Sequence, residues 1–114
     1  MSEQASEATA QDWTQGVDAI LIRECPRCDR RWYLPRDMCP GCGSAEVSTM
    51  HTDGAGVCAA VTVLAATKDR SQRAFCLIDL DDGPRMMSRC EADLRAGDRA
   101  IATYDDSAPY FVKG

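Results

Sequence analysis

Alternating apolar and polar positions from residue 19 onward predict a chain of short β-strands. Residues 19–24 (AILIRE) and 30–35 (RRWYLP) are expected to form the first two strands. After Ser44, further strands are expected between turns rich in Gly, Pro, Asp and Ser. They are predicted at residues 47–52, 56–66, 74–82, 84–92, 99–106 and 110–114. Such a series of short strands is typical of a small barrel.

Tight turns and regular alternation support the barrel. The Asp-Gly-Pro turn that begins at Asp82 predicts that residues 75–80 and 85–90 pair as a hairpin. In residues 56–63 and 97–104, apolar and small side chains alternate, as a barrel wall requires. The fold class expected from these patterns is mainly β.

The first twenty residues are polar and acidic and have a different pattern. Trp13, Val17, Ile20 and Leu21 recur at intervals of three and four, which predicts a helix over residues 11–19 with one apolar face. Residues 1–8 are expected to be frayed. Gly16 interrupts the pattern, so a disordered leader is the alternative. A docked helix is preferred because Trp13 would otherwise have no partner for burial.

Composition narrows the classes of protein to consider. The 114 residues carry a formal charge of -5, which does not favour binding to a polyanion. No secretory signal and no apolar stretch long enough to span a bilayer is visible, so a soluble, cytoplasmic protein without membrane association is expected.

In that reducing compartment cysteines serve as metal ligands or free thiols. Cys58, Cys76 and Cys90 lie among apolar neighbours and are expected in the core.

Two Cys-x-x-Cys pairs, separated by ten residues, carry the strongest chemical signal. Cys25, Cys28, Cys39 and Cys42 would each lie on a hairpin turn, and four thiolates suit tetrahedral structural zinc. Iron in the same cage, or a redox or merely buried set of thiols, are the alternatives. Because cysteine would fill all four coordination positions of the metal, no position remains for water or substrate. The cluster is therefore expected to be a structural staple of a compact, rubredoxin-like ribbon.

No catalytic residues are expected in this chain. His51 is the single histidine, and no positioned nucleophile or carboxylate network accompanies it in the sequence. Asp79, Asp81 and Asp82 flank a turn and are expected to be solvated.

The cysteine-rich segment is basic within an acidic chain. Residues 21–45 contain five arginines (Arg23, Arg27, Arg30, Arg31 and Arg36) against three acidic residues. Such a surface suits a phosphate or an acidic partner. An ordinary solvated face is the alternative.

Five motifs follow one another along the chain in a recognisable order. They are Leu34-Pro35-Arg36, Cys39-Pro40-x-Cys42-Gly43-Ser44, Gly54-x-Gly56-Val57, the strand from Phe75 to Leu80 with Asp81-Asp82-Gly83, and Leu94-x-x-Gly97-x-x-Ala100. In this order they resemble the zinc-ribbon and OB-fold family of acyl-CoA-associated proteins. The resemblance covers nearly the whole chain, with Asp29 standing where the family usually has glycine.

The resemblance implies three regions and a role. Residues 1–20 would form a leader and helix, 21–45 a zinc ribbon, and 46–114 an OB-fold barrel. The chain would be a non-catalytic subunit of a hetero-oligomer with a thiolase-superfamily enzyme: a thiolase, acyltransferase or aldolase. A CoA thioester would bind at the partner interface. Candidate contacts to the partner or CoA are Trp13, Arg27, Arg30, Arg31, Trp32, Tyr33, Arg36, Tyr110 and Phe111.

Two other functions remain as alternatives. Small barrels of this kind often bind single-stranded nucleic acid through a basic groove and stacking aromatics. Residues 46–114 are net acidic and contain only four aromatics, which argues against that function. Iron in the cysteine cage would instead make the chain an electron carrier.

Overall fold

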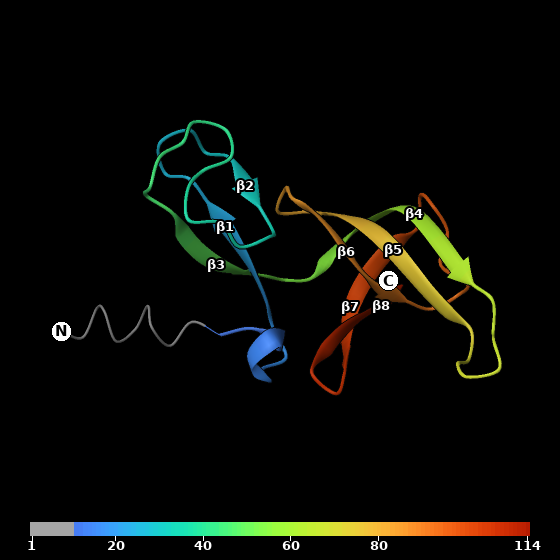
Figure 1. The fold of residues 1–114 in the computed structure, drawn as a ribbon. Helices are drawn as coiled ribbons and strands as arrows, with labels where there is room; N and C mark the ends of the chain where they lie inside the picture. Colours follow the sequence, from blue (N-terminus) through green and yellow to red (C-terminus); the bar gives the residue numbers. More distant parts are fainter. Residues whose placement is uncertain (1–10) are drawn as a thin grey trace.

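The computed structural model describes residues 11–114 and shows a mainly β protein built from a small sheet and a barrel (Figure 1). The sheet has the order β2-β1-β3. Its strands are β1 (Ile20–Glu24), β2 (Arg31–Trp32) and β3 (Ser48–Thr52). The closed barrel has the order β4-β5-β6-β8-β7. Its strands are β4 (Ala55–Leu64), β5 (Arg73–Leu80), β6 (Arg85–Cys90), β7 (Arg99–Asp105) and β8 (Ala108–Lys113).

The three-stranded sheet is antiparallel and centred on β1. Glu24 is opposite Arg31 of β2, and Leu21 is opposite His51 of β3. Ile20 and Ile22 are fully buried and belong to the core of the barrel, so β1 links the two parts. Because β3 pairs with β1, the sheet extends to Thr52. The division of the chain at residues 20 and 45 stays a prediction.

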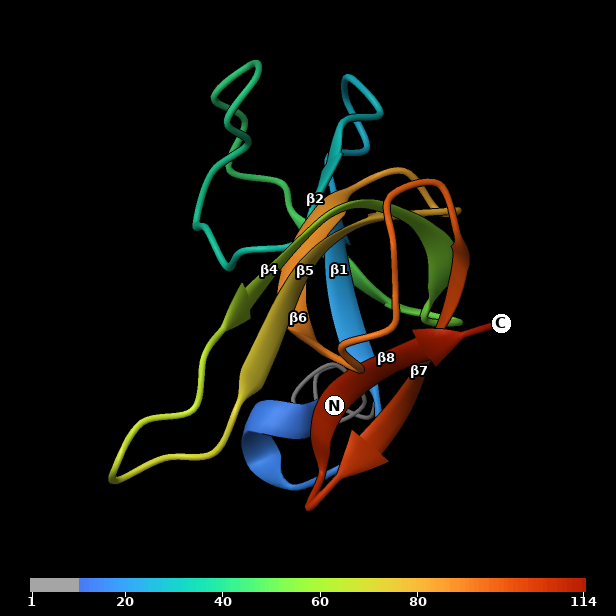
Figure 2. The same cartoon turned by 90° about the vertical axis from the view of Figure 1, so that its right-hand side faces the viewer.

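The barrel follows from the alternation seen in the sequence. Along β5, every second residue is buried, and the predicted hairpin with β6 is confirmed. Cys76 is opposite Ser88 in that hairpin, and Gly83 N donates to the carbonyl oxygen of Leu80 in its turn. Figure 2 shows β4, β5 and β6 on one side of the barrel and β7 and β8 on the other.

Twelve buried residues form the core of the barrel, and the three cysteines of the barrel are among them. Cys58, Cys76 and Cys90 are at most 3% exposed, which confirms that they are core residues. Burial raises the pKa of each of the three thiols, so they stay protonated at neutral pH. Among the described residues, no helix is long and apolar enough to cross a membrane.

The predicted helix over residues 11–19 is wrong: the structure has a single 3-10 turn, η1 (Trp13–Gln15). The Asp12 carboxylate accepts a hydrogen bond from Thr14 N, and Gly16 ends the turn at φ 85°, a left-handed conformation suited to glycine. Trp13 nevertheless docks, because its Nε1 donates to the Tyr33 hydroxyl at 3.0 Å. The predicted fraying of residues 1–8 lies outside the described residues.

In the barrel, Gly56 of β4 lies opposite Leu80 of β5, at a point where the neighbouring backbone leaves no room for a side chain. A Cβ at this position would lie 2.8 Å from Leu80 Cα and against the Asp79 carbonyl oxygen. Gly56→Ala is therefore expected to lower the free energy of unfolding by about 1 to 3 kcal/mol, the usual cost of overpacking, measured by urea denaturation. Gly114→Ala is the control, since its Cβ would meet atoms only at 3.7 Å or beyond. Equal stability of both variants would contradict the assigned contact.

Candidate metal centre

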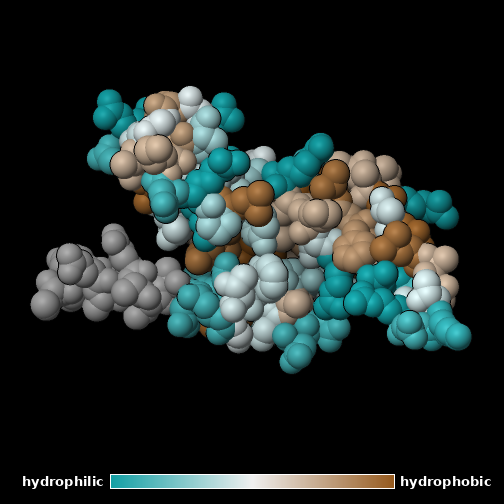
Figure 3. All heavy atoms as spheres, in the orientation of Figure 1, coloured by the Kyte–Doolittle hydropathy of each residue, from teal (hydrophilic) through white to brown (hydrophobic). Residues whose placement is uncertain are grey.

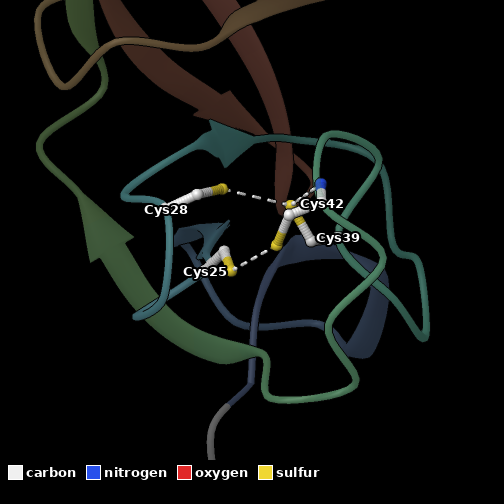
Figure 4. A group of neighbouring side chains, drawn as sticks. All are labelled: Cys25, Cys28, Cys39 and Cys42. Atoms are coloured by element: carbon white, nitrogen blue, oxygen red, sulfur yellow. Dashed lines mark hydrogen bonds between the residues drawn. The ribbon is translucent and has the colours of Figure 1, made fainter.

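Four thiols from two loops converge at the end of the sheet that lies away from the barrel (Figure 4). Cys25 follows β1 and Cys28 precedes β2, while Cys39 and Cys42 lie in the loop between β2 and β3. The Sγ atoms of Cys25 and Cys42 are 3.6 Å apart, as are those of Cys28 and Cys39. All four Sγ atoms lie within 4.8 Å of one another. The structure thus brings together the cysteines that the spacing grouped.

The two loops repeat one backbone pattern. In the first, Cys25 N donates to the carbonyl oxygen of Arg30, and Cys25 O accepts from Asp29 N. In the second, Cys39 N donates to the carbonyl oxygen of Ser44, and Cys39 O accepts from Gly43 N. Each cysteine pair therefore lies in the same kind of turn.

Asp29 and Gly43 occupy equivalent positions in these two turns. Both have positive φ, 64° for Asp29 and 78° for Gly43. Glycine adopts this conformation without strain, and aspartate tolerates it better than most other residues do. The departure from the family pattern at Asp29 therefore leaves the turn geometry intact.

The donor set fits a tetrahedral metal site. Four sulfurs at about 2.3 Å from a central zinc ion would lie about 3.8 Å from one another. The observed separations of 3.6 Å, with every pair within 4.8 Å, agree with that tetrahedron. Each turn supplies one buried thiol (Cys25, Cys39) and one exposed thiol (Cys28, Cys42). The cluster is therefore open on one side, which gives an ion a way in from solvent.

Backbone groups favour a thiolate at one of the ligands. Burial opposes ionisation of Cys39, but hydrogen bonds from the backbone N–H groups of Cys42 and Gly41, at 3.4 and 3.2 Å, lower its pKa to about 6. For Cys28, a backbone hydrogen bond from Arg30 lowers the pKa, while the contact with Cys39 and burial raise it, to about 12 overall. The backbone N–H groups around Cys39 therefore favour its thiolate, which is the form of cysteine that binds a metal cation.

The segment around the thiols has little core of its own. Its buried cluster consists of Cys25, Trp32 and Cys39, with Val47 packed against it. So few apolar residues cannot hold two loops together by hydrophobic burial alone. A metal bound to the four thiols would supply the missing stability, as it does in other small cysteine-rich modules.

The candidate arginines of the ribbon have different surroundings. Arg27, Arg30 and Arg36 are exposed. Arg31 is held in place, since its Nε donates to Glu24 at 3.1 Å and its Nη1 donates to the Asp82 carbonyl oxygen at 2.8 Å. Arg31 therefore connects the ribbon to the barrel.

The candidate aromatic contacts also divide into two groups. Trp13, Tyr33 and Tyr110 are partly exposed and can still meet a partner. Trp32 is only 8% exposed and Phe111 is fully buried, both inside this chain. The predicted direct contact is wrong for Phe111, because its strand position faces the barrel core. The pattern of β8 alone could not show which face is inside, since apolar and aromatic residues lie on both.

Asp82 is a structural residue that the sequence reasoning missed. Its carboxylate accepts a hydrogen bond from the Thr52 hydroxyl, and its carbonyl oxygen accepts the one from Arg31. Asp79 and Asp81 form exposed ion pairs with Arg85 and Arg99. No local signal distinguishes Asp82 from its neighbours, because its partners are distant in the sequence.

His51 lies on the exposed surface of β3. Its Nε2 is 3.0 Å from the carbonyl oxygen of Gln11. The absence of catalytic residues stays a prediction.

Comparison with known proteins identifies the segment that holds the thiols. Residues 16–48 match the family described as "ChsH2, rubredoxin-like zinc ribbon domain". This segment is similar to a rubredoxin-like zinc ribbon. No curated protein sequence matches the chain.

Two solved structures share the ribbon and barrel over almost the whole chain. One, titled "Ltp2-ChsH2(DUF35) aldolase", has a TM-score of 0.72 at 18% identity and covers 93% of this chain and 97% of its own. The other is a DUF35 family protein of unknown function from Sulfolobus solfataricus, with a TM-score of 0.68 at 15% identity, covering 90% and 79%. These likenesses confirm the fold that the resemblance implied, a zinc ribbon joined to a small barrel.

We expect the seven cysteines to divide into four metal ligands in the ribbon and three core residues in the barrel. Cys39→Ser is expected to lose the bound metal and unfold the ribbon, because it removes a buried ligand that also accepts two backbone hydrogen bonds. Elemental analysis should find one zinc per chain in the unchanged protein and less than a tenth of that in the variant. Cys76→Ser, in the barrel core, should keep the metal and serves as control. Equal metal loss in both variants, or iron in place of zinc, would contradict the assignment.

Proposed function

We propose that this chain is a non-catalytic accessory subunit that binds structural zinc and assembles with a thiolase-superfamily acyl-CoA enzyme. That partner would be a thiolase, acyltransferase or aldolase, and the complex a hetero-oligomer. The observation that carries the proposal is the joint arrangement of ribbon and barrel, which matches a chain from an aldolase structure over 93% of this protein. The matched ribbon family supports the same role.

The metal would act in folding. Cysteine supplies all four ligands, so a bound zinc ion would keep no open position for a substrate or an activated water. Binding at such a site contributes on the order of 10 kcal/mol to folding. The ordered ribbon would then present β1 and β3 to the barrel, with Arg31 and Thr52 both bonded to Asp82.

The accessory role would consist of supporting the partner's substrate site. We place a barrel of the OB type beside that site, where a CoA thioester would bind at the shared interface. The exposed arginines of the ribbon (Arg27, Arg30 and Arg36) suit its phosphates or acidic residues of the partner. The complex would work in the cytoplasm, where thiols stay reduced.

Co-expression with each candidate thiolase-superfamily protein from the same organism tests the proposal. We expect the two proteins to purify as one complex that turns over acyl-CoA, whereas the isolated chain has no turnover. Size-exclusion chromatography and thioester assays of each protein, alone and mixed, measure this. Turnover by the isolated chain, abolished by His51→Ala, would contradict the non-catalytic role. A partner that is fully active and never associates would contradict the accessory role.

Exposed arginines give a second test of this function. Replacing Arg27 and Arg36 together with alanine should weaken the complex or raise the apparent KM for acyl-CoA about two- to tenfold at low salt. The loss should shrink above about 0.5 M salt, because exposed charges are screened within a few ångströms there. Arg31→Ala should instead lower the thermal stability of the chain, since it loses two intramolecular hydrogen bonds. A salt-independent loss in the double variant would contradict an electrostatic contact.

A further inference from the structure

The outer face of the β5–β6 hairpin carries an exposed apolar row. Inward positions such as Cys76, Ile78 and Met86 fill the core, so the alternate positions point outward. In register, Leu77 lies between Ala60 of β4 and Met87 of β6. Met87 is 66% exposed. Figure 3 shows apolar side chains gathered over this side of the barrel, bordered by hydrophilic ones.

A groove extends this row toward the ribbon. It has a volume of about 350 Å³ and lies between β6, the start of β8 and the hydrogen-bonded pair of Trp13 and Tyr33. Phe75 and Met87 line it on the barrel side. We call the row and the groove together the β5–β6 face; its residues are Trp13, Tyr33, Phe75, Leu77, Met87 and Arg89. Methionine adapts its shape easily and is common on surfaces that bind other proteins.

Cations border this apolar face, although the chain as a whole is acidic. Arg89 lines the groove, and its guanidinium lies 6.0 Å from the ring centroid of Tyr110. Arg73 lies at the same distance from the ring of Phe75. Among residues 11–114, Arg89 forms an ion pair with Asp105 at 3.5 Å, and both side chains of the pair are exposed. Such a pair contributes little, so Arg89 can exchange Asp105 for a carboxylate of another molecule at small cost.

These features define the chemistry of an occupant. An apolar side chain would fill the groove, and a carboxylate next to it would meet Arg89. A protein surface supplies both within a few residues. Single-stranded nucleic acid would instead need successive exposed aromatics on which bases stack. Here Trp13 and Tyr33 are hydrogen-bonded to each other in the groove wall, and the outward row continues from Phe75 with the aliphatic Leu77 and Met87. The face therefore suits a protein better than a nucleic acid.

We infer that the β5–β6 face is the surface that docks onto the catalytic subunit, through an apolar side chain of that subunit flanked by a carboxylate. The inference rests on the proposed function and adds which surface of this chain contacts the catalytic subunit. A contiguous apolar patch rimmed by charge is typical of a protein interface. Burial of Met87 and the groove aromatics would supply most of the affinity, because a few central residues usually dominate binding. Arg89 would supply charge complementarity and orientation.

Paired substitutions test the face in the full-length, metal-loaded chain. Met87→Asp is expected to weaken binding to the co-expressed thiolase-superfamily protein about tenfold or more, measured by isothermal titration calorimetry. Its control is Ile101→Asp, which places the same charge on an exposed apolar residue of β7 that does not line the groove. Arg89→Ala should weaken binding at low salt, whereas Arg99→Ala, in an exposed ion pair with Asp81, should not. Metal content and melting temperature verify that each variant is folded.

The possible outcomes separate this inference from the proposed function. Weaker binding only in the two β5–β6 face variants supports both. A complex that forms normally with Met87→Asp, or is weakened equally by Ile101→Asp, overturns the face but keeps the accessory role. Failure of the unchanged chain to bind the catalytic protein overturns both. Binding of an oligothymidine probe that Arg89→Ala abolishes, with no effect of either variant on the protein complex, would make the face a nucleic-acid site instead.

Discussion

The convergence of four thiols is the interaction on which the ribbon depends. Two loops with the same hydrogen-bond pattern bring Cys25, Cys28, Cys39 and Cys42 to a spacing that fits tetrahedral sulfur coordination. The loops bury almost no apolar side chains that could hold them together. Without a cation, several thiols would share this small volume with little to stabilise it. The strands that leave the loops would then lose their common anchor.

The ribbon is connected to the barrel through β1 and through hydrogen bonds to Asp82. Ile20 and Ile22 extend from the ribbon sheet into the barrel core. Asp82, in the turn between β5 and β6, accepts hydrogen bonds from Arg31 and Thr52 of the ribbon sheet. The metal site and the β5–β6 hairpin are therefore parts of one connected structure. A metal bound to the four thiols would in this way support the geometry of the proposed docking face.

The distribution of chemistry over the chain agrees with an accessory role. At the cysteine cluster, backbone N–H groups of the turn donate hydrogen bonds to the Cys39 sulfur. The thiols of the barrel are buried and protonated at neutral pH. The exposed features are of another kind: arginines on the ribbon and an apolar groove bordered by cations on the barrel. Such surfaces recognise other molecules, and their energy comes from burial and charge complementarity.

The sequence by itself determined the features that depend on local spacing. Two Cys-x-x-Cys pairs defined the metal site, and period-two alternation located the strands and the β5–β6 hairpin, because both signals lie within a few residues. The N-terminal helix was predicted wrongly because Asp12 and Gly16 close a single turn, and their local hydrogen bonds outweigh the weak apolar period. Tertiary structure alone decided that Phe111 faces the core, that Asp82 joins ribbon to barrel, and that Met87 continues a groove with Trp13 and Tyr33. Each depends on strand register and on pairings between residues distant in the chain, which no local pattern encodes.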